Sequence, residues 1–378
     1  MGDDGASAMG EMLKVNGELR VLECHGNRIR DAGAEELCRG LRMHTKLTKL
    51  NLSSNVISGL GLIQLTNCFR DNHPLADLDL SKNQVCDATM LHMGQSLSEN
   101  TSLTKLNVDG NGLRDLGIKW MVNGLGLNSS LQDLQLRFTQ IGPEGAEHLG
   151  AWLKYNRGLT ALNIAQNSIG RSGGQAIADG LLENNTLTRL QLSYNGVRDT
   201  GAIAIAKAIK VSGNTALTHL DLGENGLGAD GAVGVCEHLT GNTTLRRLFL
   251  HRNYIGDEGA LYVANWMKSG IHVDTLYLES NEISAIGCMG LRDALYKNQS
   301  IKEFSMTGNL IGHIGCAYLA MVIGDSRVLE SVRLHSCGIG ELGAMTLGKA
   351  IDVNRSVKYL EIGGNSIGDR CVYTRMYF

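Results

Sequence analysis

The chain has 378 residues, a net charge of −3 and a hydrophobic fraction of 43%. It can therefore bury a continuous core, and it carries no basic excess of the kind that neutralises nucleic-acid phosphates. The chain contains 48 Gly but 2 Pro, and 5% of its residues are aromatic, which indicates many turns around an aliphatic core. The sequence shows no apolar stretch long enough to span a bilayer, and no signal peptide is visible at the acidic N-terminus, Met1-Gly2-Asp3-Asp4.

One pattern recurs along almost the whole chain. When each repeat is written as one line, the line begins L-x-x-L-x-L-x-x-N-x-I/L, as in residues 47–57. Successive lines begin 28 residues apart, except for one step of 30. The lines begin at Leu19, Leu47, Leu75, Leu103, Leu131, Leu159, Leu187, Leu217, Leu245, Val273, Ile301, Leu329 and Val357. We predict a helical half-repeat over residues 1–18, a repeat array over 19–369, and an irregular tail or cap over 370–378.

Each line predicts a short strand followed by a turn and a helix. Leu50 and Leu52 alternate with a polar residue, which favours a strand with one buried face. The ninth position is Asn in eleven lines, where a buried amide can pair with loop backbone groups, and Thr139 in this column should make fewer bonds. Gly recurs at the fifteenth position, at the start of the helix. Asn recurs at the helix end, where we expect the left-handed conformation that closes a helix.

The repeat resembles the leucine-rich-repeat family, and its 28-residue strand-and-helix unit resembles the ribonuclease-inhibitor subclass. The segment Asn253-Tyr-Ile-Gly-Asp-Glu-Gly-Ala260 is also similar to the arrays of NOD-like receptors and of related ciliary proteins. The resemblance implies an α/β fold, a right-handed horseshoe solenoid of about 13 repeats. Because strands lie about 4.8 Å apart and packed helices about 8–10 Å apart, the parallel sheet should be concave and the helices convex.

The sequence contains no catalytic constellation, and we expect no cofactor and no metal. Residues 226–231 match GxGxxG, but they fall in register with the turn and helix start of the other repeats. Three histidines that share one repeat position lie too many repeats apart to bind one ion. The nine cysteines form no CxxC pair and no disulfide-framework spacing. We therefore interpret Cys288 and Cys316 as small core residues in a reducing, cytoplasmic compartment.

The side chains expected to face outward from the strands are the candidate functional residues. From the fifth line onward these positions carry large aromatic and basic groups, including Tyr359, and such types are enriched at interface hot spots. An alternative is that they are scattered surface rings resting on neighbouring strands. The predicted protein-binding residues are Arg137, Phe138, Arg189, Tyr194, Arg247, Phe249, Arg252, Tyr277 and Arg333.

These observations favour a non-enzymatic protein-binding module or scaffold that uses the concave sheet. We expect a protein partner, with no nucleic acid and no membrane, and a cytoplasmic location that includes ciliary or cytoskeletal assemblies. Residues 370–378 could fold back as a cap or make an end-to-end contact. Three alternatives stay open: a GTPase-activating protein of the Ran type, a ribonuclease inhibitor, and a sensor array of the NOD-like-receptor type.

Overall fold

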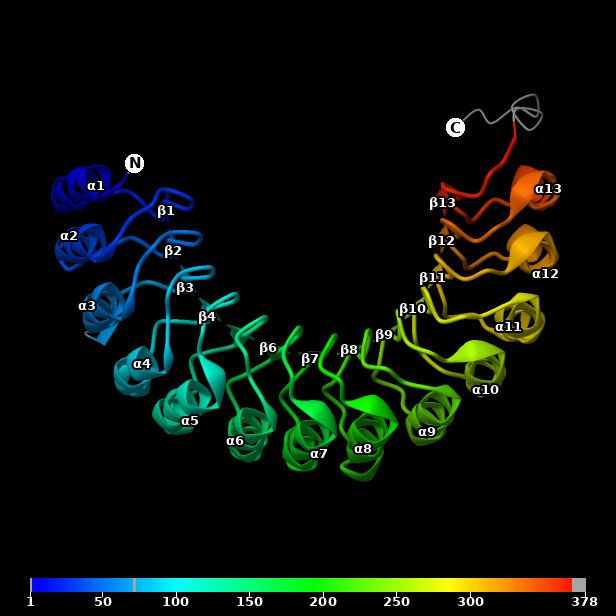
Figure 1. The fold of residues 1–378 in the computed structure, drawn as a ribbon, viewed down its shortest axis with the longest axis horizontal. Coiled ribbons are helices and arrows are strands. Elements are labelled where there is room, and N and C mark those ends of the chain that lie inside the picture. The colour runs from blue at the N-terminus through cyan, green and yellow to red at the C-terminus, as the bar shows by residue number, and fades with distance from the viewer. Residues whose placement is uncertain (1, 71–72, 369–378) are drawn as a thin grey trace. The chain divides into compact units, whose positions relative to one another are not determined.

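A computed structural model describes residues 2–70 and 73–368 of the chain. The chain divides into two compact units, residues 1–195 and residues 196–378, each built from the same succession of strand, turn and helix. Within each unit, the strands lie side by side on the inner edge of a curve and the helices lie on its outer edge (Figure 1). The tail predicted over residues 370–378 lies outside the described residues.

The first unit begins with a helix that has no strand before it in the described residues, α1 (Asp3–Val15). Its strands are β1 (Val21–Glu23), β2 (Lys49–Asn51), β3 (Asp77–Asp79), β4 (Lys105–Asn107), β5 (Asp133–Gln135), β6 (Ala161–Asn163) and β7 (Arg189–Gln191). Its other helices are α2 (Asp31–Leu41), α3 (Gly59–Arg70), α4 (Asp87–Glu99), α5 (Arg114–Gly124), the short 3-10 helix η1 (Leu125–Leu127), α6 (Pro143–Leu153) and α7 (Gly170–Leu181).

The second unit continues the same order. Its strands are β8 (His219–Asp221), β9 (Arg247–Phe249), β10 (Thr275–Tyr277), β11 (Glu303–Ser305), β12 (Ser331–Arg333) and β13 (Tyr359–Glu361). Its helices are α8 (Arg198–Val211), α9 (Ala229–Leu239), α10 (Gly256–Met267), α11 (Ala285–Lys297), α12 (Gly312–Asp325) and α13 (Gly340–Val353).

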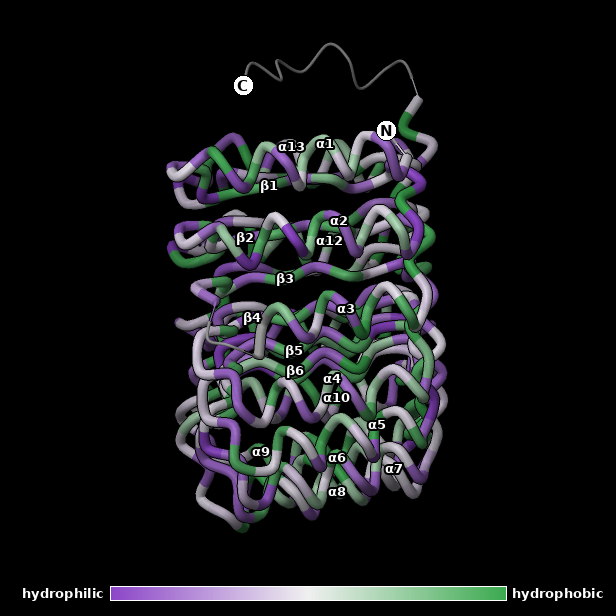
Figure 2. Tube along the Cα trace, turned by 90° about the vertical axis from the view of Figure 1, so that its left-hand side faces the viewer, coloured by the Kyte–Doolittle hydropathy of each residue, from purple (hydrophilic) through white to green (hydrophobic). Residues whose placement is uncertain are grey.

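Strand pairing follows the repeat without a slip. Within each unit neighbouring strands are parallel and paired one repeat apart, as in Leu22 opposite Leu50 and Leu276 opposite Phe304. The central residue of each strand points into the layer between strands and helices, where Leu50 and Leu276 are fully buried. Hydrophobic and hydrophilic residues accordingly alternate along the strands and helices (Figure 2). The predicted solenoid, with strands on the concave side and helices on the convex side, is confirmed within each unit.

The asparagine at the ninth repeat position links adjacent repeats. The Asn55 amide oxygen accepts hydrogen bonds from the backbone N–H groups of Asn27 and Ile29, both at 3.0 Å, and its amide nitrogen donates to the carbonyls of Cys24 and Leu52. At the same position, the Thr139 hydroxyl donates to the Leu136 carbonyl at 2.7 Å and contacts the next asparagine. The prediction that Thr139 makes fewer bonds is confirmed in the described residues.

The asparagines at the helix ends form a second ladder, and the conformation predicted for them is wrong. Asn100 and Asn128 are extended, with φ −80° and −72°, and neither is left-handed. The Asn100 side-chain oxygen instead accepts from the N–H groups of Ser102 and Leu103, while the Asn128 amide donates to the carbonyls of Leu97 and Asn100 in the preceding repeat. The side chain therefore turns the chain from helix into strand, which makes a left-handed residue unnecessary.

Acidic residues form a third ladder at the helix starts. The Asp257 carboxylate in α10 accepts from the backbone N–H groups of Ser284 and Gly287, which begin α11, at 2.8 and 2.9 Å. A Cβ on Gly287 would lie 2.8 Å from that carboxylate and 2.5 Å from Ile283, which explains the glycine at this position. Each such aspartate caps the helix of the next repeat and complements its dipole. The same arrangement joins Asp115 in α5 to the start of α6.

The turn before the helix adopts one of two forms. After Asp257, the turn residue Ser284 is extended, with φ −102°. Where the preceding helix has Ala285 instead of an acid, the turn residue Gly312 is left-handed, with φ +64°, and its N–H donates to the carbonyl of Cys337 in the following repeat. In these two repeats an acid accompanies a turn that bonds backward and an alanine accompanies a turn that bonds forward. An acid is not sufficient by itself, because Arg114, which follows Asp87, is left-handed (φ +44°) and its N–H donates to the carbonyl of Thr139 in the following repeat.

Two cysteines of the first unit are paired, which the sequence did not predict. Cys38 in α2 and Cys68 in α3 form a disulfide, with their Cα atoms 6.1 Å apart. They lie one repeat and two residues apart, so the helical stacking of repeats brings them together. The interpretation of Cys288 and Cys316 as buried core thiols is confirmed: both are free and fully buried, and burial raises the pKa of each to about 12.

Candidate protein-binding site

The predicted site residues fall into two structural classes. Arg189, Arg247, Phe249, Tyr277 and Arg333 lie on strands and face the concave side, as expected. Arg137, Phe138, Tyr194 and Arg252 lie in the turns that follow the strands, so their predicted placement on strands is wrong. Each strand ends at the fifth repeat position, but backbone hydrogen bonds between repeats continue to the eighth, as from the Arg252 N–H to the Glu279 carbonyl. The eighth residue is left-handed, as in Phe138 (φ +55°), Tyr194 (φ +57°) and Arg252 (φ +52°).

The four candidates of the first unit are exposed and lie in separate places, except that Arg137 and Phe138 are neighbours in one turn. The Phe138 and Tyr194 side chains are 67% and 57% exposed, in turns two repeats apart, and no ring contact joins them in the described residues. Arg137 donates to the Gln166 side chain at 2.8 Å, and Arg189 lies 3.8 Å from the Asp133 carboxylate. These residues form separate exposed points rather than one cluster.

Three of the five candidates of the second unit, Phe249, Tyr277 and Arg333, contact one another. The rings of Phe249 on β9 and Tyr277 on β10 meet edge to face, with centroids 5.0 Å apart and an interplanar angle of 67°. The Arg333 guanidinium on β12 lies between two tyrosines, 5.2 Å from the Tyr277 ring centroid and 5.4 Å from that of Tyr359 on β13. We call Arg247, Phe249, Tyr277, Arg333 and Tyr359 the strand-face cluster; Tyr359 was noted as outward-facing but left out of the predicted set.

Two glutamates hold this cluster in place. The Tyr277 hydroxyl donates to the Glu303 carboxylate at 3.0 Å and accepts from Arg333 at 2.5 Å. Arg333 also lies 3.7 Å from Glu303 and 3.9 Å from Glu361. Burial, followed by the hydrogen bond to Glu303, raises the pKa of Tyr277, so its hydroxyl stays protonated at neutral pH. No sequence signal pointed to these partners, because Glu303 and Glu361 stand at the third and fifth repeat positions without a distinguishing motif.

The remaining basic residues differ in how they are held. Arg252, in the turn after β9, lies 3.4 Å from the Glu224 carboxylate. Arg247 on β9 is exposed, and its guanidinium has no ion pair among the described residues. Arg247 is therefore a cation at the edge of the cluster that is available to a partner carboxylate.

The GxGxxG segment has a structural explanation. The N–H of Gly228, before α9, donates to the Asp199 carboxylate at 2.8 Å, so a protein carboxylate already fills the place that a phosphate would take. A Cβ on Gly231 would lie 2.1 Å from the same carboxylate. Within the described residues, no group of three or more His, Cys, Asp or Glu side chains is arranged to hold a metal ion. No described helix is long and apolar enough to cross a membrane.

Comparison with known families agrees with this geometry. A family model described as Leucine Rich repeat matches residues 44–65, 99–119, 127–150, 155–178, 183–206, 213–236, 241–264 and 353–370. The chain is a leucine-rich-repeat protein. Proteins of this kind are typically non-enzymatic binding modules. The ribonuclease-inhibitor subtype stays a prediction, and no curated protein matches the chain.

Solved structures support the fold alone. The yeast Rad7 and Elc1 complex is 15% identical, with a TM-score of 0.50, over 98% of this chain and 78% of that chain. Leiomodin-1 actin-binding site 2 is 25% identical over 40% of this chain and 85% of its own, with a TM-score of 0.33. An internalin, inlF of Listeria monocytogenes, is 19% identical over 80% of this chain and 93% of its own, with a TM-score of 0.42. The last two similarities are too low to support an argument about partners.

Proposed function

We propose that this leucine-rich-repeat protein is a non-enzymatic binding module that holds a partner protein against the concave side of its second unit. The observation that carries the proposal is the strand-face cluster, in which side chains from β9, β10, β12 and β13 make a continuous set of ring and guanidinium contacts. Aromatic residues and Arg are the types that dominate binding energy at protein interfaces, especially where they cluster.

The internal contacts of the cluster support this proposal because they preorganise the surface. Arg333 is held by two rings and by Glu303 and Glu361, so it loses little rotamer freedom when a partner covers it. An unrestrained side chain of this kind costs about 0.5–1.5 kcal/mol to immobilise in an interface. Tyr359 is half exposed, so part of its ring remains available for contact after the internal packing is made.

Affinity capture followed by reconstitution tests the proposal. Wild-type protein would be compared with the triple variant Arg247→Ala/Phe249→Ala/Tyr359→Ala, which removes exposed parts of the cluster and leaves the Tyr277–Glu303 hydrogen bond in place. Any captured protein would be purified, and its dissociation constant measured for both forms. We expect the triple variant to bind at least about a hundredfold more weakly, since truncating a hot-spot residue commonly costs about 2 kcal/mol or more.

A matched control comes from the helical side of the same unit. The variant Tyr262→Ala/Tyr296→Ala/Lys297→Ala also removes two aromatic rings and one cation, from α10 and α11. It should bind the partner as wild type does. Equal binding by the wild-type protein and the strand-face variant would show that the partner uses another surface.

Three narrower parts of the proposal rest on the sequence: the class of partner, a second contact region and the cellular location. The near-neutral charge supports a protein partner rather than a nucleic acid. Arg137, Phe138, Arg189 and Tyr194 form a proposed second contact region on the first unit. The cytoplasmic setting, with ciliary or cytoskeletal assemblies included, is likewise a prediction, and immunolocalisation of the endogenous protein would test it.

A further inference from the structure

The second unit carries an apolar surface on its helical side, away from the strand-face cluster. Ile286, Ile314 and Leu342 occupy the same repeat position, in the first turn of α11, α12 and α13, and are 60%, 52% and 65% exposed. The equivalent residue is polar in Glu144 and Glu258, whereas in the first unit it is apolar and exposed in Leu60 and Leu116. Because neighbouring helices pack together in sequence order, the three apolar side chains form a row.

A second row widens this surface. One helical turn later, Leu261, Met289 and Met345 lie on the same faces of α10, α11 and α13 and are 38%, 43% and 48% exposed. A Cβ on Gly290 would lie 2.4 Å from Leu261, so Leu261 leans from α10 onto α11 and closes the gap between the two helices. We call these six residues, Leu261, Ile286, Met289, Ile314, Leu342 and Met345, the helix-start patch.

The helix-start segments that carry the patch contain acidic residues but no Lys or Arg. These segments, residues 254–261, 282–289, 310–317 and 338–345, include Asp257, Glu258, Glu282 and Glu341. Glu258 and Glu282 are exposed. Asp257 is already bonded to the start of α11, so the exposed glutamates are the charges available to a partner. The patch is therefore an apolar surface with an acidic edge at the helix starts, while Arg292 and Lys349 lie one helical turn farther along α11 and α13.

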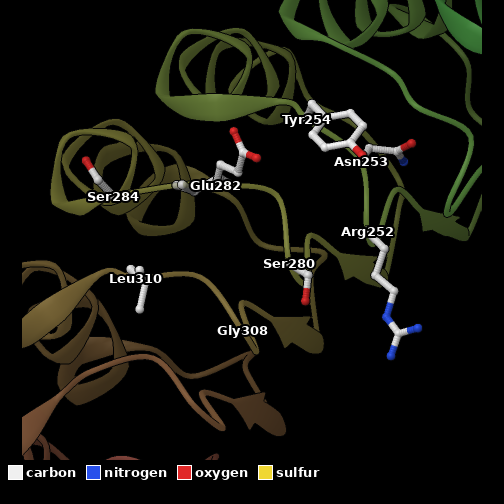
Figure 3. A pocket seen from close by; sticks show the side chains of 9 residues that line it. Arg252, Asn253, Tyr254, Ser280, Glu282, Ser284, Gly308 and Leu310 are labelled. Carbon is white, nitrogen blue, oxygen red and sulfur yellow. The ribbon is translucent and has the colours of Figure 1, made fainter.

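A cavity of about 500 Å³ adjoins the patch. It is lined by Tyr254, Glu282, Ile283 and Leu310 from three successive turns between strand and helix, together with Arg252 and Ser284. Tyr254, Glu282 and Leu310 lie along the helical side of this cavity, while the Arg252 side chain points away toward the strands (Figure 3). The exposed Tyr254 and Leu310 extend the apolar surface toward the strands.

We propose that the helix-start patch binds a basic amphipathic helix of a partner protein. Packed helices lie about 8–10 Å apart, and a heptad of an α-helix rises about 10.5 Å, so a crossing helix could place one apolar group over each of α11, α12 and α13. Methionine side chains adapt to varied apolar partners, and basic residues on the flanks of the helix would face Glu258 and Glu282. This proposal is independent of the strand-face cluster.

A designed peptide tests the proposal directly. The probe is a fluorescein-labelled 21-residue helix of Leu and Lys with all Leu on one face over three heptads. Its binding to the full chain is measured by fluorescence anisotropy at low salt. The patch variant, Ile286→Gln/Ile314→Gln/Leu342→Gln, removes apolar surface without changing charge and should bind at least about tenfold more weakly. Replacing Glu258 and Glu282 with Gln should also weaken binding, and high salt should reduce that difference.

Three controls separate this interpretation from others. The variant Leu60→Gln/Leu116→Gln/Leu127→Gln alters three exposed leucines of the first unit and should bind the peptide as wild type does. A scrambled Leu/Lys peptide with no apolar face and a Leu/Glu peptide with the original pattern should both bind at least about tenfold more weakly. Equal binding of the scrambled peptide, no binding by wild type, or an unaffected patch variant would overturn the proposal. So would sedimentation showing that the patch joins two copies of this chain.

Discussion

Replacing Asn309 by alanine measures how strongly one inter-repeat ladder stabilises the second unit. Asn309 is fully buried, its oxygen accepts from the N–H groups of Asn281 and Ile283, and its nitrogen donates to the carbonyls of Leu278 and Met306. Asn309→Ala leaves all four backbone groups without that partner. At about 1 kcal/mol or more for each buried group, we expect a loss of about 4 kcal/mol in the free energy of unfolding.

Cysteine provides the matched comparison for this experiment. Cys337 occupies the same repeat position, and its Sγ donates to the Met306 carbonyl at 3.3 Å. Asn309→Cys should therefore keep about one of the four hydrogen bonds and lose about three-quarters as much stability as Asn309→Ala. Hydrogen exchange of the Asn281 and Ile283 amides should report the same loss locally, with urea unfolding as the global measure. A loss below about 1 kcal/mol for Asn309→Ala, with both amides still protected, would refute this account of the ladder.

Three further predictions concern the first unit. Phe138→Gly should raise the free energy of unfolding by about 1 kcal/mol, because a left-handed non-glycine residue is strained, and a lower urea midpoint would contradict this. Burial raises the pKa of Asp109 to about 6, so the folded state binds its proton more tightly and stability falls as pH rises from about 4 to 6. Asp109→Asn should flatten this pH dependence of stability. The variant should be about 1 kcal/mol more stable than the wild-type protein at pH 7, and the full pKa shift sets an upper limit of about 3 kcal/mol. An equal pH dependence in both proteins would refute this. Reducing the Cys38–Cys68 disulfide should lower stability by about 3–4 kcal/mol, and peptide mapping that finds both residues as free thiols in the unreduced protein would contradict the pairing.

The repeat period made the fold predictable. A strand of three residues has no independent stability, so the column of buried Leu and the column of Asn must recur in phase for the layers to stack, and that recurrence is visible in the sequence. The position of a residue within the repeat does not by itself determine its backbone conformation. Asn100 was expected to be left-handed because Asn tolerates that region, yet its side chain turns the chain through two hydrogen bonds and keeps φ negative.

The candidate site was predicted only in part, for a similar reason. Residue type and repeat position identified Phe249, Tyr277 and Arg333 as outward-facing. Their grouping depends on side chains that reach across strands, and the Arg333 contact with Tyr277 passes over a whole intervening repeat. The helix-start patch went unnoticed because single apolar residues at one helical position look unremarkable until three adjacent helices place them side by side.

We expect a double substitution to convert the turn before α11 from the extended form to the left-handed form. Asp257→Ala removes the hydrogen bonds that hold Ser284 extended, at 2.8 and 2.6 Å, and should cost about 2 kcal/mol. Ser284→Gly alone should cost a few tenths of a kcal/mol, as glycine does at a helix N-cap. In the Asp257→Ala background, the glycine introduced by Ser284→Gly would be free to adopt the left-handed form seen at Gly312, whose N–H bonds to the next repeat instead. The second substitution should then recover about 1 kcal/mol, so the double-mutant cycle has a favourable coupling energy. Strictly additive losses in urea unfolding would show that Asp257 does not select the form of the turn before α11.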